Sequence, residues 1–384
     1  MTFVIASKIF TCYFARTFSK QKSMNVVKDR KTWGELVGQC EGTDFYHTYD
    51  YHQISKKNGE RPALIEYNDG DRRIALPLLI RDIEGTHLKD ATSVYGYGGP
   101  IGKNIDSQFN NWDFGKKLEE FLRDNQIVSV FSRLHPFVSY QSSILQGIGK
   151  IVSHGNVVNI DLTKNLEQQK QQYKKRLKTY INKEAKEYEI IDGSCDNCLD
   201  IFIGTYCENM KRVKAKSSYF FGKEYFYELL ASPQINAELK VAKHKQTGDF
   251  AGGAIFTRNN GIVQYHLSGV KAQYFHLNPI KLLIDHERIQ ATKEGYTYFN
   301  LGGGLGVHDQ DSLFYFKSGF SNDYRKFCSW QYVVDEKKYQ ELLKQKQALD
   351  AMEIDKNSCF FPLYRQGTST EIEISKINCL GNDR

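Results

Sequence analysis

The chain has 384 residues, of which 40% are hydrophobic and 25% are charged. These values are typical of a globular protein with enough apolar material for a core, and they exclude a disordered or collagen-like chain. The 7 prolines argue against long structureless linkers. No uncharged apolar stretch reaches the ~18 residues that a membrane-spanning helix needs. The length predicts about one to three domains.

The net charge of +7 is concentrated in two consecutive segments. Residues 164–188 contain eight basic and three acidic residues, and residues 205–223 contain five basic residues and one acidic residue. These segments carry +5 and +4, so the rest of the chain carries −2. A local positive field favours an anionic partner such as a phosphate, a nucleotide, tRNA or a lipid headgroup. A solvated helix face is the alternative explanation.

The first 23 residues are apolar and basic and contain no acidic residue. Lys8 interrupts the apolar run and no Ala-x-Ala site follows, so a signal peptide is not expected. We expect a disordered leader or an over-extended start before Met24, with a weak membrane-surface anchor as the alternative.

The eight scattered cysteines favour reduced thiols. We interpret the Cys195–Cys198 spacing as a turn rather than a metal or redox pair.

We predict that residues 24–160 form an N-terminal domain. It contains a hairpin with an Asp-Gly turn, residues 61–67 and 72–80, in which Pro77 suggests an edge position or a bulge. A glycine- and tyrosine-rich stretch follows at 93–100. The other expected elements are helices at 31–39, 46–57 and 114–125 and strands at 128–133 and 157–162.

The segment 161–340 predicts a second domain, and 341–384 a C-terminal helix and polar tail. A long basic helix at 166–187 opens this domain. The best-defined helix runs from Asn278 to Glu294, with Asn278 as the cap and Pro279 at the first helical position. The remaining elements are a strand at 188–191, helices at 199–213 and 223–230, a meander at 239–244, 250–258 and 262–270, a strand at 296–301, a short helix at 312–319, a strand at 326–334 and a helix at 336–352.

This order of elements is similar to that of the GNAT acyltransferase fold. Asn300-Leu-Gly-Gly-Gly304, followed by Asp311-Ser-Leu-Phe-Tyr-Phe316-Lys317-Ser-Gly-Phe320, resembles the signature of the FemAB-like branch of GNAT proteins. Residues 95–100 and 133–136 resemble the first domain of that branch. The resemblance covers about residues 24–339. It implies an α+β fold of tandem GNAT-like domains with mixed, mostly antiparallel sheets flanked by helices, the second domain holding the donor site.

The resemblance also implies a function. The branch includes aminoacyl transferases of peptidoglycan bridges and acetyltransferases of polysaccharide and lipid clusters. We therefore expect a cytoplasmic N-acyltransferase that needs no metal and moves an acetyl group from acetyl-CoA, or another acyl group from its CoA ester. The acceptor would be an amino group of a sugar nucleotide or of a cell-envelope, lipid-linked precursor, with peripheral membrane contact as an option. The alternatives are aminoacyl-tRNA-dependent transfer to a peptidoglycan precursor and a non-catalytic ligand-binding module.

The sequence departs from the family at one place. Acetyl-CoA-dependent GNAT proteins carry a glycine-containing loop that binds pyrophosphate before the helix corresponding to 278–294. Here that loop, residues 271–279, contains no glycine. The N-terminus of the helix at Asn278 could still bind an anion through its amides and dipole, but the usual CoA-binding loop is missing.

Acyl transfer to an amine needs a neutral amine, an oriented ester or thioester, and donors for the developing oxyanion. Lys317 is the candidate cation for an acceptor phosphate or for transition-state charge, although it could also be a surface lysine. Asp311 either orients and deprotonates the amine or caps the short helix. His266 is either a base near neutral pH or a core histidine. His308 is a weaker candidate.

The glycine run and several aromatic residues are candidates for binding the donor or substrate. In the GNAT fold the fourth and fifth strands separate and the acyl chain lies between them, where glycines let backbone amides approach a ligand. The alternative for the glycines is a plain strand-to-loop turn, and the alternative for the aromatic residues is a position in the core or at the rim. The candidates are Gly302, Gly303, Gly304, Phe316, Tyr97, Tyr219 and Asn278.

Overall fold

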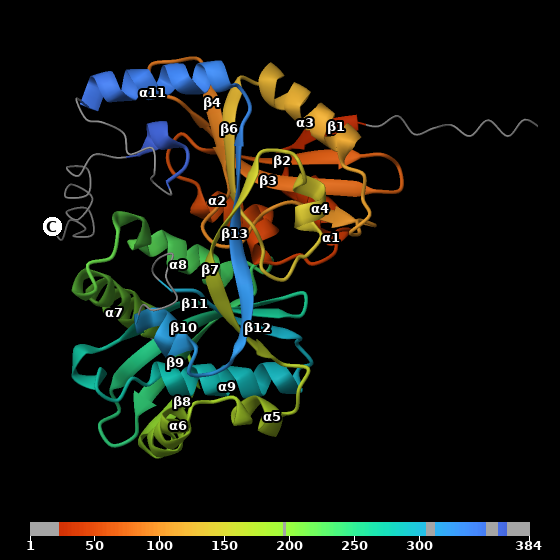
Figure 1. Cartoon of the computed structure of the whole chain (residues 1–384). Coiled ribbons are helices and arrows are strands. Elements are labelled where there is room, and N and C mark those ends of the chain that lie inside the picture. The colour runs from red at the N-terminus through yellow and green to blue at the C-terminus, as the bar shows by residue number, and fades with distance from the viewer. Residues whose placement is uncertain (1–22, 195–196, 305–311, 351–359, 367–384) are drawn as a thin grey trace, which may run out of the picture.

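The computed structural model describes residues 23–194, 197–304, 312–350 and 360–366. In this part of the chain, thirteen strands form one mixed, mostly antiparallel sheet in the order β1-β2-β3-β4-β6-β13-β7-β12-β11-β10-β9-β8, with β5 paired to β3. Helices flank this sheet (Figure 1). The expected fold class, an α+β chain with a mostly antiparallel sheet flanked by helices, is confirmed.

In the first half of the sheet, the Asp-Gly turn joins β2 and β3 as an antiparallel hairpin, as predicted. The strands of this half are β1 (Ser23–Val27), β2 (Arg61–Asn68), β3 (Arg73–Asp82), β4 (Lys89–Thr92), β5 (Ile101–Lys103) and β6 (Ile127–Arg133). Its helices are α1 (Arg30–Gly38), α2 (Tyr49–Ser55), α3 (Trp112–Asp124) and α4 (Gln141–Leu145), with the 3-10 helix η1 (Phe45–His47) before α2.

The second half contains the predicted meander, β9 (Ala237–His244), β10 (Phe250–Asn259) and β11 (Ile262–Val270), followed along the sheet by β12. Its other strands are β8 (Tyr188–Asp192) and β12 (Tyr298–Gly302). Its helices are α5 (Leu166–Gln171), α6 (Lys175–Glu187), α7 (Cys198–Arg212), α8 (Lys223–Ala231), α9 (Ile280–Lys293) and α10 (Ser312–Lys317), with the 3-10 helices η2 (Ser217–Tyr219) and η3 (Ala272–Tyr274).

Two long central strands, β7 (Lys150–Asp161) and β13 (Asp323–Val333), connect the halves. β13 pairs with β7 along most of its length and with β6 at its end, whereas the end of β7 pairs with β12. Figure 1 shows both strands running through the middle of the molecule. The chain then forms α11 (Glu336–Asp350) and the 3-10 helix η4 (Leu363–Arg365) on the first half.

Two local predictions, for one helix and one cysteine, are wrong. The helix expected at 166–187 is broken between α5 and α6, because Lys174 is extended and its N–H donates to the carbonyl of Gly319 at 2.9 Å. The prediction for Pro77 holds locally: it pairs only with β2 and falls between the residues of β3 that pair with β5 and those that pair with β4, a local edge where no N–H is required. Cys198 is disulfide-bonded rather than reduced.

The start of α9 also differs from the prediction. Pro279 is the N-cap residue, and no side chain bonds to the free amides of the first turn. Asn278 instead has a φ of +39° and closes the preceding turn through its N–H, which donates to the carbonyl of Tyr274 at 3.0 Å. Asn278 therefore ends a tight turn and does not cap the helix.

The core consists of several apolar clusters, one of which joins the two halves. In it, Phe45, Tyr46 and Tyr51 of the first half pack with side chains of α7 and α8, including Phe202 and Phe226. No helix in the described residues is both long and apolar enough to cross a bilayer.

One buried acid provides a test of the packing of α6. The Glu184 side chain has no exposed surface, and neither carboxylate oxygen has a hydrogen-bond partner within the described residues. Burial raises its pKa above the ordinary value of 4.5. The folded protein therefore retains a proton that the unfolded chain releases, so this residue makes the protein less stable as the pH rises above 4.5.

We predict that Glu184→Gln increases the free energy of unfolding by about 1–2 kcal/mol at pH 8, because it removes an unpaired buried charge. The increase should shrink as the pH falls towards 4.5. Urea unfolding at several pH values measures this, with Glu189→Gln on the exposed side of β8 as the control. A gain of the same size at every pH would contradict the explanation.

Candidate functional site

A cavity of about 480 Å³ lies where β11 and β12 separate. The two strands pair in parallel only from Ile262 to Gln264 and from Tyr298 to Asn300. Beyond that point, Tyr265 and His266 on β11 and Leu301 and Gly302 on β12 line the cavity. The separation of strands expected from the GNAT-like element order is therefore present.

The cavity wall combines cations with aromatic rings. Arg133, Lys216 and Lys317 supply positive charge, and no Asp or Glu occurs among the described lining residues. Nine Phe and Tyr rings also line the cavity, those of Tyr46, Tyr95, Tyr97, Phe131, Tyr219, Tyr265, Phe327, Phe360 and Phe361. Such a site suits an anionic ligand with an apolar or ring-shaped part.

Most residues that the sequence singled out come together here. Those that line the cavity are Lys317, His266, Gly302, Gly303, Gly304, Tyr97 and Tyr219. Phe316 packs instead into the core of the second half, 5.9 Å from the Phe320 ring. Asn278 is not among the lining residues, since it lies in the turn before α9. Asp311 and His308 lie outside the described residues.

Lys317 ends α10 and is held against the glycine segment. Its Nζ donates to the carbonyl of Gly303 at 2.8 Å, and the side chain is buried. A Cβ at position 302 would lie 3.1 Å from that Nζ, and Gly302 has a φ of +78°. Glycine is thus required at 302 both for the backbone conformation and for the approach of Lys317.

Tyr97 crosses from the first half of the sheet to the same glycines. Burial raises the pKa of its phenol to about 12, although hydrogen bonds to the backbone of Gly303 and to Asn300 lower it in part. Its ring meets that of Tyr46 edge to face, with centroids 5.6 Å apart. Tyr97 is therefore protonated at neutral pH and fixed in orientation.

His266 is less basic than the sequence suggested. Burial lowers its pKa to about 4, so the imidazole is neutral at pH 7. Its Nε2 forms a hydrogen bond with the hydroxyl of Tyr225 at 2.8 Å, and its ring packs edge to face on Phe45 at 5.3 Å. A histidine with this pKa is a weak general base at neutral pH.

A chain of buried hydrogen bonds connects the first half of the sheet to the glycine segment. Asp44 accepts from Gln264 Nε2 at 2.7 Å and lies 3.0 Å from Nε2 of His135. Asn300 Nδ2 donates to Gln264 Oε1 at 2.8 Å, and Asn300 Oδ1 accepts from the N–H of Gly302 at 2.9 Å. The first half of the sheet therefore positions the end of β12.

Sequence reasoning missed several of these residues. Arg133 lies in the stretch 133–136 that resembles the family, and Lys216 lies in the second basic segment. The sequence therefore pointed to both segments, but not to these two residues as members of the site. Asp44 and Gln264 had no such signal, because they meet across 220 residues of sequence.

The turn before α9 offers few free amides to a CoA pyrophosphate. In the turn 271–279, the N–H groups of Tyr274, Phe275, Leu277 and Asn278 already donate to carbonyls of the same turn. The guanidinium of Arg212 lies 4.1 Å from the centre of the Phe275 ring and covers one side of the turn. These four amides are therefore occupied, whereas the first turn of α9 has no side-chain cap.

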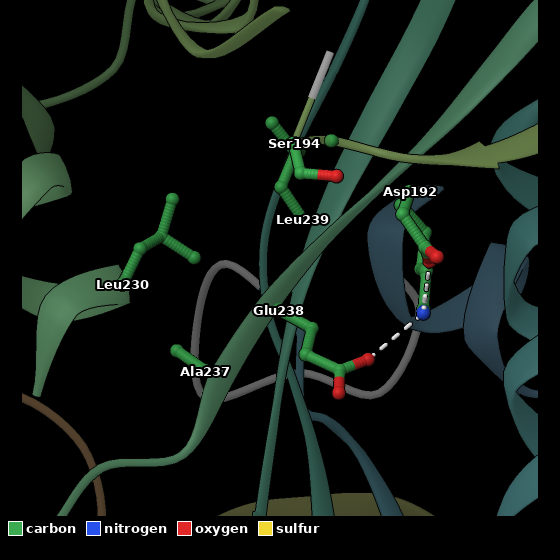
Figure 2. A pocket seen from close by; sticks show the side chains of 8 residues that line it. Asp192, Ser194, Leu230, Ala237, Glu238 and Leu239 are labelled. Atoms are coloured by element: carbon green, nitrogen blue, oxygen red, sulfur yellow. Dashed lines mark hydrogen bonds and ion pairs between the residues drawn. The ribbon is translucent and has the colours of Figure 1, made fainter. Parts of the chain in front are cut away.

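A second cavity, of about 370 Å³, lies at the edge formed by β8 and β9. Figure 2 shows Asp192 and Glu238 turned towards a single nitrogen, which is Nζ of Lys240, at 2.6 and 2.8 Å. Because both carboxylates are already paired with Lys240, and no candidate residue lies here, we place the functional site in the first cavity.

Comparison with known proteins supports the fold. No protein-family model and no curated protein matches the sequence. FemX matches with a TM-score of 0.64 and 12% identity, covering 84% of this chain and 99% of FemX. L-PGS from Bacillus licheniformis matches with a TM-score of 0.52 and 14% identity, covering 80% of this chain and 93% of its own. Identities this low show the fold alone, which is the FemX-type fold that the resemblance implies.

The buried chain of hydrogen bonds can be tested by Asp44→Asn. His135 and Gln264 both bond to Oδ2, and the N–H of Phe45 donates to Oδ1 at 2.7 Å. An amide has one acceptor oxygen in place of two, so buried donors on one side lose their acceptor and face an NH₂ group. We predict a loss of about 2–4 kcal/mol in the free energy of unfolding, measured by urea unfolding. The control is Asp82→Asn, whose carboxylate forms an exposed pair with Arg61 at 2.6 Å, and which should cost less than ~1 kcal/mol. Equal losses in the two variants would contradict the assignment.

Proposed function

We propose that this protein is an N-acyltransferase that moves an acyl group to an amino group of an anionic acceptor. The observation that carries the proposal is the cavity between β11 and β12, with three cations, nine aromatic rings and the backbone of Gly302–Gly304 in its wall. The FemX-type fold is in keeping with this activity.

In the proposed reaction the amine nitrogen attacks the carbonyl carbon of the acyl donor. The bond from that carbon to the oxygen or sulfur of the donor breaks, and the proton that the amine loses ends on the departing oxygen or sulfur. Negative charge develops on the carbonyl oxygen, where a fixed donor is most effective. Lys317 is suited to this role because its bond to the carbonyl of Gly303 holds the ammonium in the cavity.

The amine does not depend on a strong protein base in this proposal. His266, with a pKa of about 4, removes protons poorly at pH 7. The positive charge of Arg133, Lys216 and Lys317 disfavours a further cation nearby and so lowers the pKa of the ammonium group of an incoming acceptor. The acceptor amine would therefore be neutral when bound.

The acceptor that we propose is a sugar nucleotide or another phosphorylated envelope precursor. Arg133 and Lys216 provide positive charge for phosphate groups, and the aromatic rings provide surfaces for sugar or base. The same features would let a non-catalytic module bind such a ligand, which is why turnover has to be measured.

A specific observation favours aminoacyl-tRNA over acetyl-CoA as the donor. The turn before α9 contains no glycine and four of its amides are already bonded, which disfavours CoA, whereas the basic start of α6 lies beside α10. Lys174 Nζ donates to Ser318 Oγ at 3.1 Å and lies 4.2 Å from the centre of the Tyr315 ring. A polyanion bound along α6 would bring its end to the helix that carries Lys317.

Lys317→Met tests the proposed chemistry. It removes the ammonium while retaining much of the side-chain length, so turnover should fall about 10²–10³-fold. The measurement is amide formation on an amino-sugar nucleotide from labelled acetyl-CoA or from aminoacyl-tRNA. Lys326→Met, an exposed lysine on β13, should leave the rate unchanged. If the wild-type protein binds the acceptor but gives no turnover with either donor, it is a binding module and the proposal is wrong.

The donor can be identified by binding. If aminoacyl-tRNA is the donor, its Kd should rise steeply with salt, and Lys175→Ala with Arg176→Ala should reduce the salt slope by about two. Lys337→Ala with Lys344→Ala on α11 provides a matched pair of exposed cations away from α6, and should have no effect. Tight acetyl-CoA binding without tRNA binding would select the other donor.

A further inference from the structure

The last described segment, Phe360–Gln366, returns to the first half of the sheet and reaches the cavity. It forms the short blue segment beneath α11 in Figure 1. Phe360 and Phe361 both line the cavity, although they lie 43 and 44 positions beyond Lys317 in the sequence. The end of the chain thus supplies part of the wall of a site whose other residues come from both halves.

The segment is held by a buried carboxylate. Asp90 on β4 has no exposed surface. Its Oδ2 accepts from Arg365 Nε at 2.7 Å and from the Tyr364 hydroxyl at 3.1 Å, and its Oδ1 accepts from Arg81 Nε at 2.7 Å. Such charge-assisted bonds at a buried acceptor are strong and directional.

Further hydrogen bonds fix the position of the segment on the sheet. Arg365 Nη2 donates to the carbonyl of Asp82 at 2.7 Å, and the Tyr364 hydroxyl is 2.7 Å from Ser129 Oγ on β6. Leu363 N–H donates to the hydroxyl of Tyr339 at 3.0 Å. The position of the two phenylalanines therefore follows from fixed contacts on three elements.

These contacts create a distinct end of the cavity. Phe361 stacks on Tyr339 with an interplanar angle of 17° and lies 6.4 Å from the Phe131 ring. The guanidinium of Arg133 lies 5.4 Å from the centre of the same Phe131 ring. Phe360 is 47% exposed beside them. This end of the cavity therefore presents two cavity-lining rings of the C-terminal segment next to a cation.

We propose that Phe360 and Phe361 are specificity-determining residues. They form the wall that receives the apolar or ring-shaped part of the ligand whose negative charge Arg133 attracts, and Asp90 keeps that wall in place. The identity of this ligand as a substrate rests on the proposed function, but its binding can be measured separately.

The probe that we choose is 1-anilinonaphthalene-8-sulfonate, an aromatic sulfonate that fluoresces in apolar surroundings. We expect Phe361→Leu and Phe360→Leu in the full-length chain each to weaken its binding about three- to tenfold, the effect of a lost aromatic contact. Arg133→Met should weaken it as well, and the Arg133→Met/Phe361→Leu double variant should be less than additive. Trp112→Leu, on α3 and 68% exposed, is the control and should bind the probe as the wild type does.

Arg365→Ala provides a second measurement, because it releases the segment without changing the cavity wall itself. This variant should weaken the binding of the probe to a similar extent, while Arg81 remains paired with Asp90. Wild-type affinity in both phenylalanine variants, or an equal loss in Trp112→Leu, overturns the inference. Probe binding does not depend on turnover, so these results stand even if acyl transfer fails. Conversely, loss of turnover in Lys317→Met together with unchanged probe binding in the two phenylalanine variants would overturn the inference alone.

Discussion

The buried side chain of Asp44 is the constraint on which the arrangement of the site depends. A buried acid is tolerated only where donors surround it, and the donors here come from both halves of the sheet, His135 from the first and Gln264 from the second. Through Gln264 and Asn300 the same network reaches the N–H of Gly302. The two halves must therefore meet in one register, and that register sets the end of β12 where the cavity opens.

The cavity depends on both halves for its chemistry as well as its shape. The first half supplies Arg133 and the ring of Tyr97, and the second supplies the glycines and Lys317. Burial keeps the phenol of Tyr97 protonated and His266 neutral, so at pH 7 the formal charge on the described wall comes from the cations. This charge pattern, more than any single residue, is what favours an anionic acceptor and a neutral amine.

Local sequence signals predicted the parts of the fold that depend on local interactions. The Asp-Gly hairpin, the meander and the position of the glycine run were predictable because turn chemistry and alternation determine them. The break between α5 and α6 was not, because it depends on a bond from Lys174 to Gly319 that forms only in the folded chain. Likewise, Phe360 and Phe361 were assigned to a polar tail, since the contacts of Tyr364 and Arg365 that hold this segment on β6 and β4 span more than 200 residues.

The most direct test of the account is native mass spectrometry of the full-length protein with an added amino-sugar nucleotide. The account predicts a complex with the wild-type protein that is lost when Arg133 and Lys216 are both replaced by Met, while the double variant keeps its fold by circular dichroism. Retention of the nucleotide by a folded Arg133→Met/Lys216→Met protein would contradict the claim that this cavity binds an anionic acceptor.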